Sequence, residues 1–220
     1  LNSLYAKKEY SKYPLPTEKS TNLPVSGYAV MRSGWGKDDY YFFINHGPYS
    51  GGHSHYCILD FDIYAFGKPL ALDAGIGRTY DDTLHFKWYK ASISHNMIIV
   101  NDSNINKKEA VCENPLWVTA KDFDYFSGSE KSGYKRFGVE YKRHFLYLKP
   151  DLWLIYDKIH NDKENNVISW NLHLRGDLKT IGAYFKSFND SGLIIYPAEA
   201  YKYEINKGMA QIKLDKLSND

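Results

Sequence analysis

The side chains in this sequence that are best suited to chemistry are three histidines and an aspartate between residues 53 and 95. His53 and His55 are separated by one serine, Asp73 follows the apolar residues 70–72, and His95 precedes an apolar run. Imidazole nitrogens and a carboxylate oxygen are ordinary zinc ligands, with water or another group in the fourth position. His55, Asp73 and His95 therefore form a plausible zinc set. Separate hydrogen-bonded turn residues would produce the same pattern, because the spacings are wide.

A long strand from about residue 53 to residue 66 is predicted to carry the two neighbouring histidines. Apolar residues alternate with polar ones there, which is the mark of a half-buried strand. On a strand, residues two apart face the same side, so the imidazoles of His53 and His55 should project together. A histidine pair at the start of a core-facing strand, preceded by the glycine loop 47–52, suits the mouth of a site better than a core.

The rest of the chain has the pattern of short strands separated by turn residues. We find no helix with a strong apolar stripe and expect residues 75–91 to be irregular or weakly helical. The sequence therefore predicts an all-β fold, a large antiparallel β-sandwich in a single domain over residues 25–220, after a polar connector over residues 1–24. The further strands are expected at 27–33, 40–45, 70–73, 93–101, 141–148 paired with 152–159, 167–174 and 193–196.

Composition narrows the class of protein. The 220 residues include 28 Lys plus Arg and 26 Asp plus Glu, and the absence of a dense basic run argues against a nucleic-acid partner. No apolar window is long enough for a membrane span. The 20 Tyr, 11 Phe and 5 Trp fit a β-rich core. They would also fit a carbohydrate cleft floored by aromatic rings.

Three blocks of sequence resemble the C-terminal domain of the heparinase II/III-like polysaccharide lyases. They are Gly-Gly-His-Ser-His at 51–55, the run from Leu59 to Gly75, and the Ser-His-Asn segment with its apolar strand at 92–102. The strong match covers about residues 26–104. The resemblance implies a C-terminal β-sandwich joined to an N-terminal α-helical toroid, with a uronic-acid-containing polysaccharide bound between them and cleaved by β-elimination.

The resemblance also implies roles for individual residues. In metal-bearing members, the positions that correspond to His55, Asp73 and His95 bind zinc. The position of His53 faces the substrate and is implicated in catalysis. Imidazole and tyrosine suit the proton transfers of an elimination, and Tyr80, which follows the turn after Asp73, is a second catalytic candidate.

Other residues are candidates for binding an acidic polysaccharide. Arg32 lies on an early strand that matches the family, and we expect it in the same groove. Arg78 could pair with a carboxylate or sulfate, and Lys87 with Trp88 forms a basic-aromatic cluster suited to stacking a sugar ring. We assign structural roles to the histidines outside the matched blocks, and to His46 as a turn residue; these are His46, His85, His144, His160 and His173.

The sequence departs from the family in two ways. Tyr56-Cys57 stands where relatives often have Ala-Asp after the second histidine, which puts in doubt any hydrogen bond of that aspartate. Only 24 residues precede the predicted sandwich, so the groups that a toroid usually supplies are not in this chain. We expect an excised C-terminal domain with little activity alone, whose missing partner is the α-helical domain of the same polypeptide. By resemblance, the protein is bacterial and periplasmic or secreted.

Two other readings stay open from the residues. The first is a non-catalytic carbohydrate-binding or structural sandwich in which the histidines only hold a metal. The second is a cupin-like metal oxygenase, which a His-x-His pair with a carboxylate and a distant histidine would also suit. The usual cupin glycine pattern is absent, and the three-block match favours the lyase family.

Overall fold

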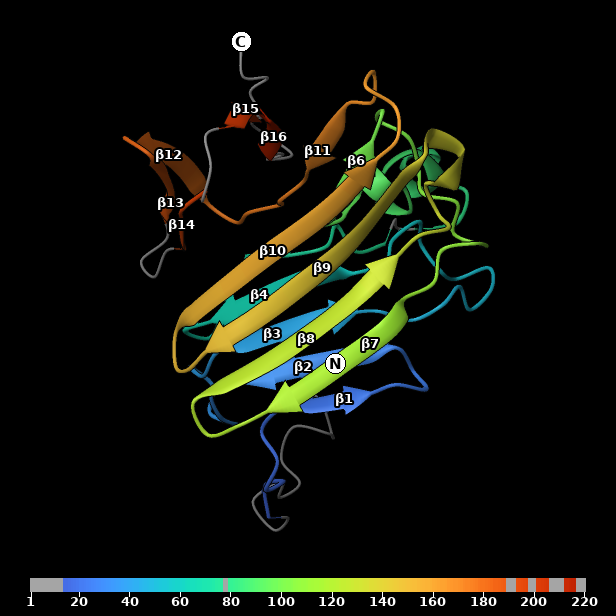
Figure 1. Ribbon diagram of the computed structural model, residues 1–220. Coiled ribbons are helices and arrows are strands. Elements are labelled where there is room, and N and C mark those ends of the chain that lie inside the picture. Colours follow the sequence, from blue (N-terminus) through green and yellow to red (C-terminus); the bar gives the residue numbers. More distant parts are fainter. Residues whose placement is uncertain (1–13, 77–78, 189–192, 198–200, 206–211, 217–220) are drawn as a thin grey trace.

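Two antiparallel sheets lie one over the other in the computed structural model and confirm the predicted sandwich (Figure 1). The structure describes residues 14–76, 79–188, 193–197, 201–205 and 212–216. One sheet has the order β1 (Thr21–Leu23), β2 (Tyr28–Arg32), β3 (Tyr41–Asn45), β4 (Asp60–Ala65) and β5 (Lys68–Ala71). The other has the order β10 (Leu152–Asn161), β9 (Val139–Leu148), β8 (Phe123–Glu130) and β7 (Glu113–Thr119).

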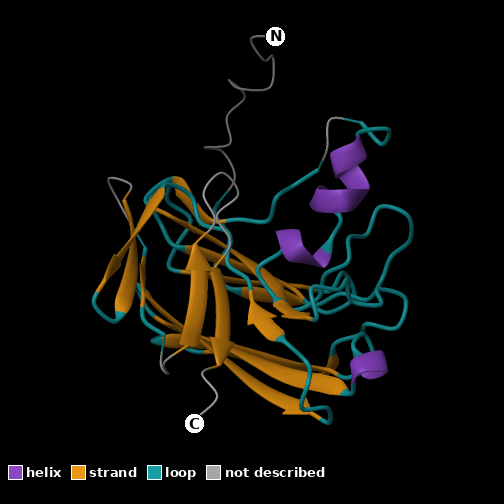
Figure 2. Cartoon of the chain, turned by 90° about the horizontal axis from the view of Figure 1, so that it is seen from above, coloured by secondary structure: helices purple, strands orange, loops and turns teal. Residues whose placement is uncertain are grey.

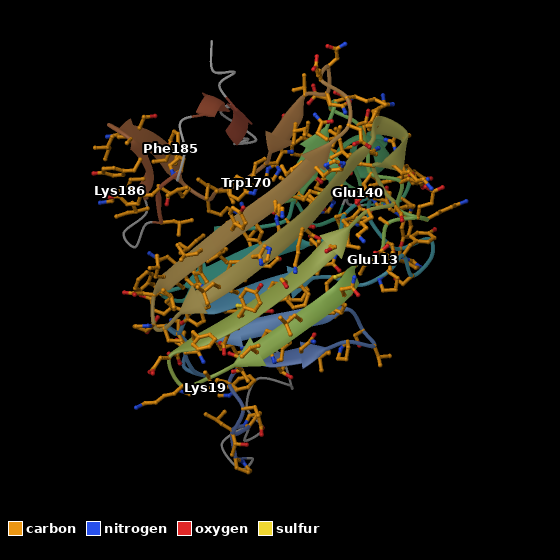
Figure 3. All side chains as sticks on the ribbon, viewed as in Figure 1. Lys19, Glu113, Glu140, Trp170, Phe185 and Lys186 are labelled. Atoms are coloured by element: carbon orange, nitrogen blue, oxygen red, sulfur yellow. The ribbon has the colours of Figure 1, made fainter. Side chains whose placement is uncertain are left out.

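Figure 3 draws the side chains on the two sheets. Aromatic residues from both sheets form much of the buried core between them. The inward positions of β3 and β4 place Phe42 and Phe61 in a stacked pair with ring centroids 5.2 Å apart. Phe145 of β9 packs edge-on against both, at 5.5 Å and 5.9 Å. Each of these rings is almost fully buried, so the layers are held mainly by apolar contact.

The remaining elements surround this sandwich, and the helical turns and long loops gather on one side of it (Figure 2). None of the helical segments in the described part of the chain has the length and apolar character that a membrane crossing requires. The smaller strands form three further sheets, β6 (Ile98–Val100) with β11 (Ile168–Trp170), β12 (Asp177–Ile181) with β13 (Tyr184–Phe188) and β14 (Ile194–Ile195), and β15 (Tyr201–Ile205) with β16 (Ile212–Lys216). The helical segments are η2, a π-helix (His85–Tyr89), and the 3-10 turns η3 (Ser92–Ser94) and η4 (Lys135–Phe137).

The β9–β10 hairpin lies where two strand-like runs around the turn at 149–151 predict it, but three other predictions need correction. Thr21–Leu23 pairs with β2, so part of the predicted connector belongs to the sheet. The long strand begins only at Asp60, and residues 53–59 are turns and loop. The strand predicted over 93–101 is confined to Ile98–Val100, because Ser92–Ser94 form a 3-10 turn. The Ser94 hydroxyl donates a hydrogen bond to the carbonyl of Ala91 in that turn, at 2.9 Å.

The long strand is cut short because its backbone is held by side chains of the opposite layer. Leu59 has a left-handed φ of 54°, which a strand does not allow. The carbonyl of Ile58 accepts a hydrogen bond from Tyr141, and the carbonyl of Leu59 accepts one from Arg143. The alternation argument therefore does not hold for His53 and His55, which lie in the loop before β4.

Arg143 is the most unusual side chain in this core because it is charged and fully buried. Its guanidinium binds both carboxylate oxygens of Asp157 on β10, at 2.7 Å and 2.8 Å. It also donates to the carbonyl oxygens of Leu59, at 2.8 Å, and Asn96, at 3.2 Å. One side chain thus joins the β9–β10 hairpin to the backbone next to Asp60 and to His95.

Replacement of Arg143 by Met should lower the free energy of unfolding by about 3–5 kcal/mol, because it leaves the nearly buried Asp157 carboxylate without its cation. Urea denaturation followed by circular dichroism measures this. Arg136→Met is the matched control, since Arg136 is exposed and stacks on Phe137. Equal losses in the two variants would contradict a central role for the buried ion pair.

Candidate metal and catalytic site

His55, Asp73 and His95 come together at the loop-rich side of the sandwich. One ligand atom from each lies within 4.8 Å of those of the other two. His55 comes from the loop before β4, Asp73 from the segment after β5, and His95 from the end of η3. The rings of the two histidines have centroids 5.3 Å apart. The structure thus brings together the three ligands that the sequence analysis expects.

His95 is fully buried, and neither of its ring nitrogens makes a hydrogen bond within the described residues. Its Nδ1 lies 2.6 Å from Oδ2 of Asp73, which brings the imidazole and the carboxylate into direct contact as an ion pair. A buried polar group without a hydrogen bond costs about 1–3 kcal/mol. A metal ion would satisfy both the imidazole and the carboxylate, so these residues fit a zinc site.

The electrostatics of the three side chains agree with this fit. Burial, and then the neighbouring His95, lower the pKa of His55 to about 4, so that its imidazole is neutral and free to bind a metal. Burial raises the pKa of Asp73, but His95, the backbone of Gly75 and His55 together bring that pKa below its usual value, and the carboxylate is ionised. Burial lowers the pKa of His95, while Cys57 and Asp73 raise it well above its usual value. A bound cation would take the place of that proton.

A second group, which the sequence analysis does not single out, shares His95. Ligand atoms of Cys57 and Asp60 also lie within 4.8 Å of one another and of His95. Asn45 donates to Asp60 at 3.0 Å and lies 3.5 Å from the Cys57 sulfur. Burial raises the pKa of Cys57 to about 12 and also raises that of Asp60. Because the family resemblance assigns the metal to His55, Asp73 and His95, we regard Cys57 and Asp60 as neighbours of the metal set.

The polar side of β4 is buried at Asp60, which explains why the sequence pattern did not mark this residue as part of the site. Alternation places Asp60 and Asp62 on the side away from the core, where carboxylates are normally solvated. The loops that carry His55 and His95 cover that end of the strand, and Asp60 is 6% exposed. Where relatives often carry an aspartate at the position of Cys57, this chain has the Asp60 carboxylate 3.8 Å from Nδ1 of His95.

His53 and Tyr80 meet beside the metal set. The hydroxyl of Tyr80 lies 2.8 Å from Nδ1 of His53, and both side chains are exposed. The edge of the Tyr80 ring also packs against His85, with centroids 5.1 Å apart. His85 is buried with no hydrogen-bond partner for either ring nitrogen among the described residues. The sequence analysis assigned His85 a structural role, and the structure places it directly behind the pair.

The expected substrate-binding residues are divided between two places. Lys87 is exposed and Trp88 half-buried on η2, and Trp88 packs edge-on against His173. Arg78 lies outside the described residues. Arg32 is paired with Tyr41 at the opposite end of β3 from Asn45, roughly 14 Å along the strand at about 3.4 Å per residue. Arg32 therefore does not contact the metal set, and its place in the same groove stays a prediction.

Comparisons with known proteins agree on one family. The family described as heparinase II/III-like, C-terminal, matches residues 15–212. The heparin-sulfate lyase of Bacteroides stercoris is 23% identical over 186 residues, which are 78% of this chain and 26% of that protein. A solved heparinase III structure has a TM-score of 0.75 at 16% identity. The match covers 94% of this chain and 35% of the heparinase III chain. The structure of a heparan sulfate lyase from Pedobacter heparinus has a TM-score of 0.74 at 18% identity. That match covers 91% of this chain and 33% of the lyase. The chain thus spans between a quarter and just over a third of these relatives, and the structural likeness supports the fold.

Asn96 should be needed to hold the backbone that carries His95. It is fully buried, its amide donates to the Phe61 carbonyl at 2.7 Å, and its oxygen accepts from the His173 backbone at 2.6 Å. We expect Asn96→Ala to lower the free energy of unfolding by about 1–3 kcal/mol, because it leaves buried backbone groups unpaired. Thermal unfolding measures the loss. Asn161→Ala is the control, since Asn161 is exposed and accepts only from the Lys163 backbone and the Asn166 side chain among the described residues. A loss no larger than in this control would contradict the role of Asn96.

Proposed function

Since the chain belongs to the heparinase II/III-like family through its C-terminal domain, we propose that it is the β-sandwich domain of a polysaccharide lyase that cleaves a uronic-acid-containing glycan by β-elimination. The single observation that carries the proposal is the hydrogen bond between His53 and Tyr80, beside the cluster of His55, Asp73 and His95. The names of the relatives, heparin-sulfate and heparan sulfate lyases, support an acidic polysaccharide as substrate.

The pair of His53 and Tyr80 has the chemistry that an elimination needs. A base must remove the proton next to the uronate carboxylate, and an acid must protonate the leaving glycosidic oxygen. As the Tyr80 oxygen takes the proton from the sugar carbon, its own proton passes across the 2.8 Å bond to Nδ1 of His53. The cationic imidazole then carries the proton that the leaving oxygen requires. One proton has moved from carbon to oxygen, and a double bond replaces the broken C–O bond.

Zinc is assigned to His55, Asp73 and His95. When bound, it would supply a positive charge that ties three separate segments of chain together and orders the loop that ends at His55. His53 lies on that loop, two residues before His55. Asp73 lies seven residues before Tyr80. The metal ligands are thus placed to hold both members of the pair in position.

The proposal assigns only part of the catalytic set to this chain. Lys87 and Trp88, on η2 beside the pair, would bind the glycan through a cation and an aromatic face, and Arg78 would add a second cation. The group that neutralises the uronate carboxylate is expected from an α-helical domain of the kind that the family carries, so this chain alone should have little activity. We place the protein in the periplasm or outside a bacterial cell.

Zinc content tests the metal assignment. The chain purified without chelators should contain about one zinc ion per molecule, because the buried His95 needs a partner. Elemental analysis of His55→Ala should show that the zinc is lost. His160→Ala is the matched control, since His160 is exposed and pairs only with Asp162, and this variant should retain the metal. A wild-type chain free of zinc and other transition metals, and unable to take up added zinc, would rule out the site.

Activity tests the catalytic pair in the longest polypeptide that the gene encodes. Tyr80→Phe should lower kcat for uronate polysaccharides by about 10²–10⁴-fold, since it removes a proton-transfer group. The assay follows the ultraviolet absorbance of the unsaturated product. Tyr125→Phe is the control, because Tyr125 makes the same kind of bond to His144, at 2.6 Å, on the other sheet.

The two outcomes that would contradict the lyase assignment are distinct. Equal activities of the Tyr80 and Tyr125 variants would exclude Tyr80 from the chemistry. Binding of acidic glycans by the wild type without any unsaturated product would favour the non-catalytic carbohydrate-binding reading.

A further inference from the structure

A pocket lies on the same sheet as the candidate site but at the other end of its strands. Its volume is about 450 Å³. It forms where the turn after β2 meets the turn between β4 and β5. Arg32 lines it, and its other lining residues are Gly34, Trp35, Gly36, Lys37, Asp39, Tyr40, Tyr41, Tyr64 and Gly67.

Arg32 lies over two aromatic rings. Its guanidinium carbon is 4.4 Å from the centroid of the Trp35 ring and 4.5 Å from that of Tyr41. These cation–π contacts hold the side chain in place without using its N–H donors, which lie in the plane of the guanidinium.

The donors of Arg32 have no anion among the described residues. The described ion pairs do not include Arg32, and its side chain makes no hydrogen bond among them. Asp39 also lines the pocket, but its carboxylate accepts from the Ser33 hydroxyl at 3.0 Å and from the backbone of Gly36 at 2.5 Å. The carboxylate of Asp39 is thus used to hold its own loop, and Lys37 adds a second cation to the pocket.

The pocket also offers aromatic faces to a ligand. Trp35 and Tyr64 are each 37% exposed, and the edge of Tyr64 packs against Tyr41, at 5.7 Å. Aromatic rings stack on the apolar faces of sugar rings, and an arginine fork binds carboxylate or sulfate through two hydrogen bonds. Together these features select a sugar that carries a negative charge.

The position of the pocket relates it to the candidate site. Tyr41 and Asn45 are four residues apart on β3 and face the same side of the sheet. Tyr41 touches Arg32, and Asn45 contacts Asp60 beside the metal set. The two places are thus on one face, separated by roughly 14 Å of strand at about 3.4 Å per residue. A glycan of several sugars could contact both.

We propose that the pocket around Arg32, Trp35 and Tyr64 is a remote subsite for an acidic sugar of the same polysaccharide chain that reaches His53 and Tyr80. The proposal rests on the proposed function in so far as the ligand is an acidic glycan. The Arg32 fork binds a sulfate or a carboxylate, and the exposed rings of Trp35 and Tyr64 hold the sugar that bears it.

Calorimetric titration with size-defined oligosaccharides tests the subsite, using the longest polypeptide that the gene encodes. Arg32→Gln should weaken the binding of long heparan sulfate fragments by about 10- to 100-fold, as expected for a lost charge-assisted pair. It should leave the binding of disaccharides, which are too short to span both places, unchanged. Arg32→Lys should restore only part of the affinity, because a lysine keeps the charge but not the fork. Arg136→Gln, at an exposed arginine stacked on Phe137, is the control.

A parallel series with unsulfated uronate fragments identifies the anion. If only sulfated fragments lose affinity in Arg32→Gln, the fork binds sulfate; if both lose it, the fork binds carboxylate. Trp35→Ala, which removes an exposed ring, should weaken the binding of long fragments in the same way. This variant tests the subsite if the arginine variants fail to fold.

The outcomes separate this inference from the proposed function. Unchanged affinity for long fragments in both Arg32→Gln and Trp35→Ala would overturn the subsite, even if the wild type cleaves the glycan. A wild type that binds long fragments through Arg32 but forms no unsaturated product would support the subsite and overturn the lyase assignment. A wild type that binds no acidic glycan would overturn the subsite.

Discussion

The buried guanidinium of Arg143 is the constraint on which the arrangement of this domain depends. A fully buried cation is tolerated only if it is paired and its donors are satisfied. Here Asp157 provides the charge, and the carbonyl oxygens of Leu59 and Asn96 accept further hydrogen bonds. Those two carbonyls belong to the residues next to Asp60 and His95. The need to satisfy one arginine in the β9–β10 layer therefore fixes the backbone on which the candidate site is built.

The same network explains why the site consists of loops on a rigid base. Leu59 leaves the strand conformation so that its carbonyl can reach Arg143, and Tyr141 binds the carbonyl before it. Asn96 then links the backbone of Phe61, in β4, to that of His173. Polar groups that would otherwise extend a strand are used to anchor a loop, whereas the aromatic core beneath supplies the stability.

Local alternation and the family resemblance predicted different parts of the structure. The β9–β10 hairpin was predicted because two strand-like runs flank the Lys149-Pro150-Asp151 turn. The metal ligands were expected because three blocks of sequence match a family. The burial of Asp60 was not visible, because it depends on loops distant in sequence that cover a face which alternation marks as solvent. Arg143 falls on the apolar face of its strand, between Tyr141 and Phe145, and that position was a signal for a buried charge. Its partner Asp157 becomes evident only from the register of the hairpin, which pairs the two residues.

The separation of the anchored base from the proposed catalytic pair has a chemical reason. His53 and Tyr80 lie on exposed loops, where a polymer can reach them, but proton transfer across a 2.8 Å bond requires a fixed geometry. Exposed loops do not provide this by packing, because they bury little surface. In the proposed arrangement, half-buried residues close to each member of the pair in sequence do so instead. His55 follows His53, Asp73 precedes Tyr80, and both lie beside the buried imidazole of His95. The connection from Arg143 through Asn96 to His95 therefore continues outward to the pair. Different residues of one continuous network thus stabilise the core and leave the proposed reacting groups accessible.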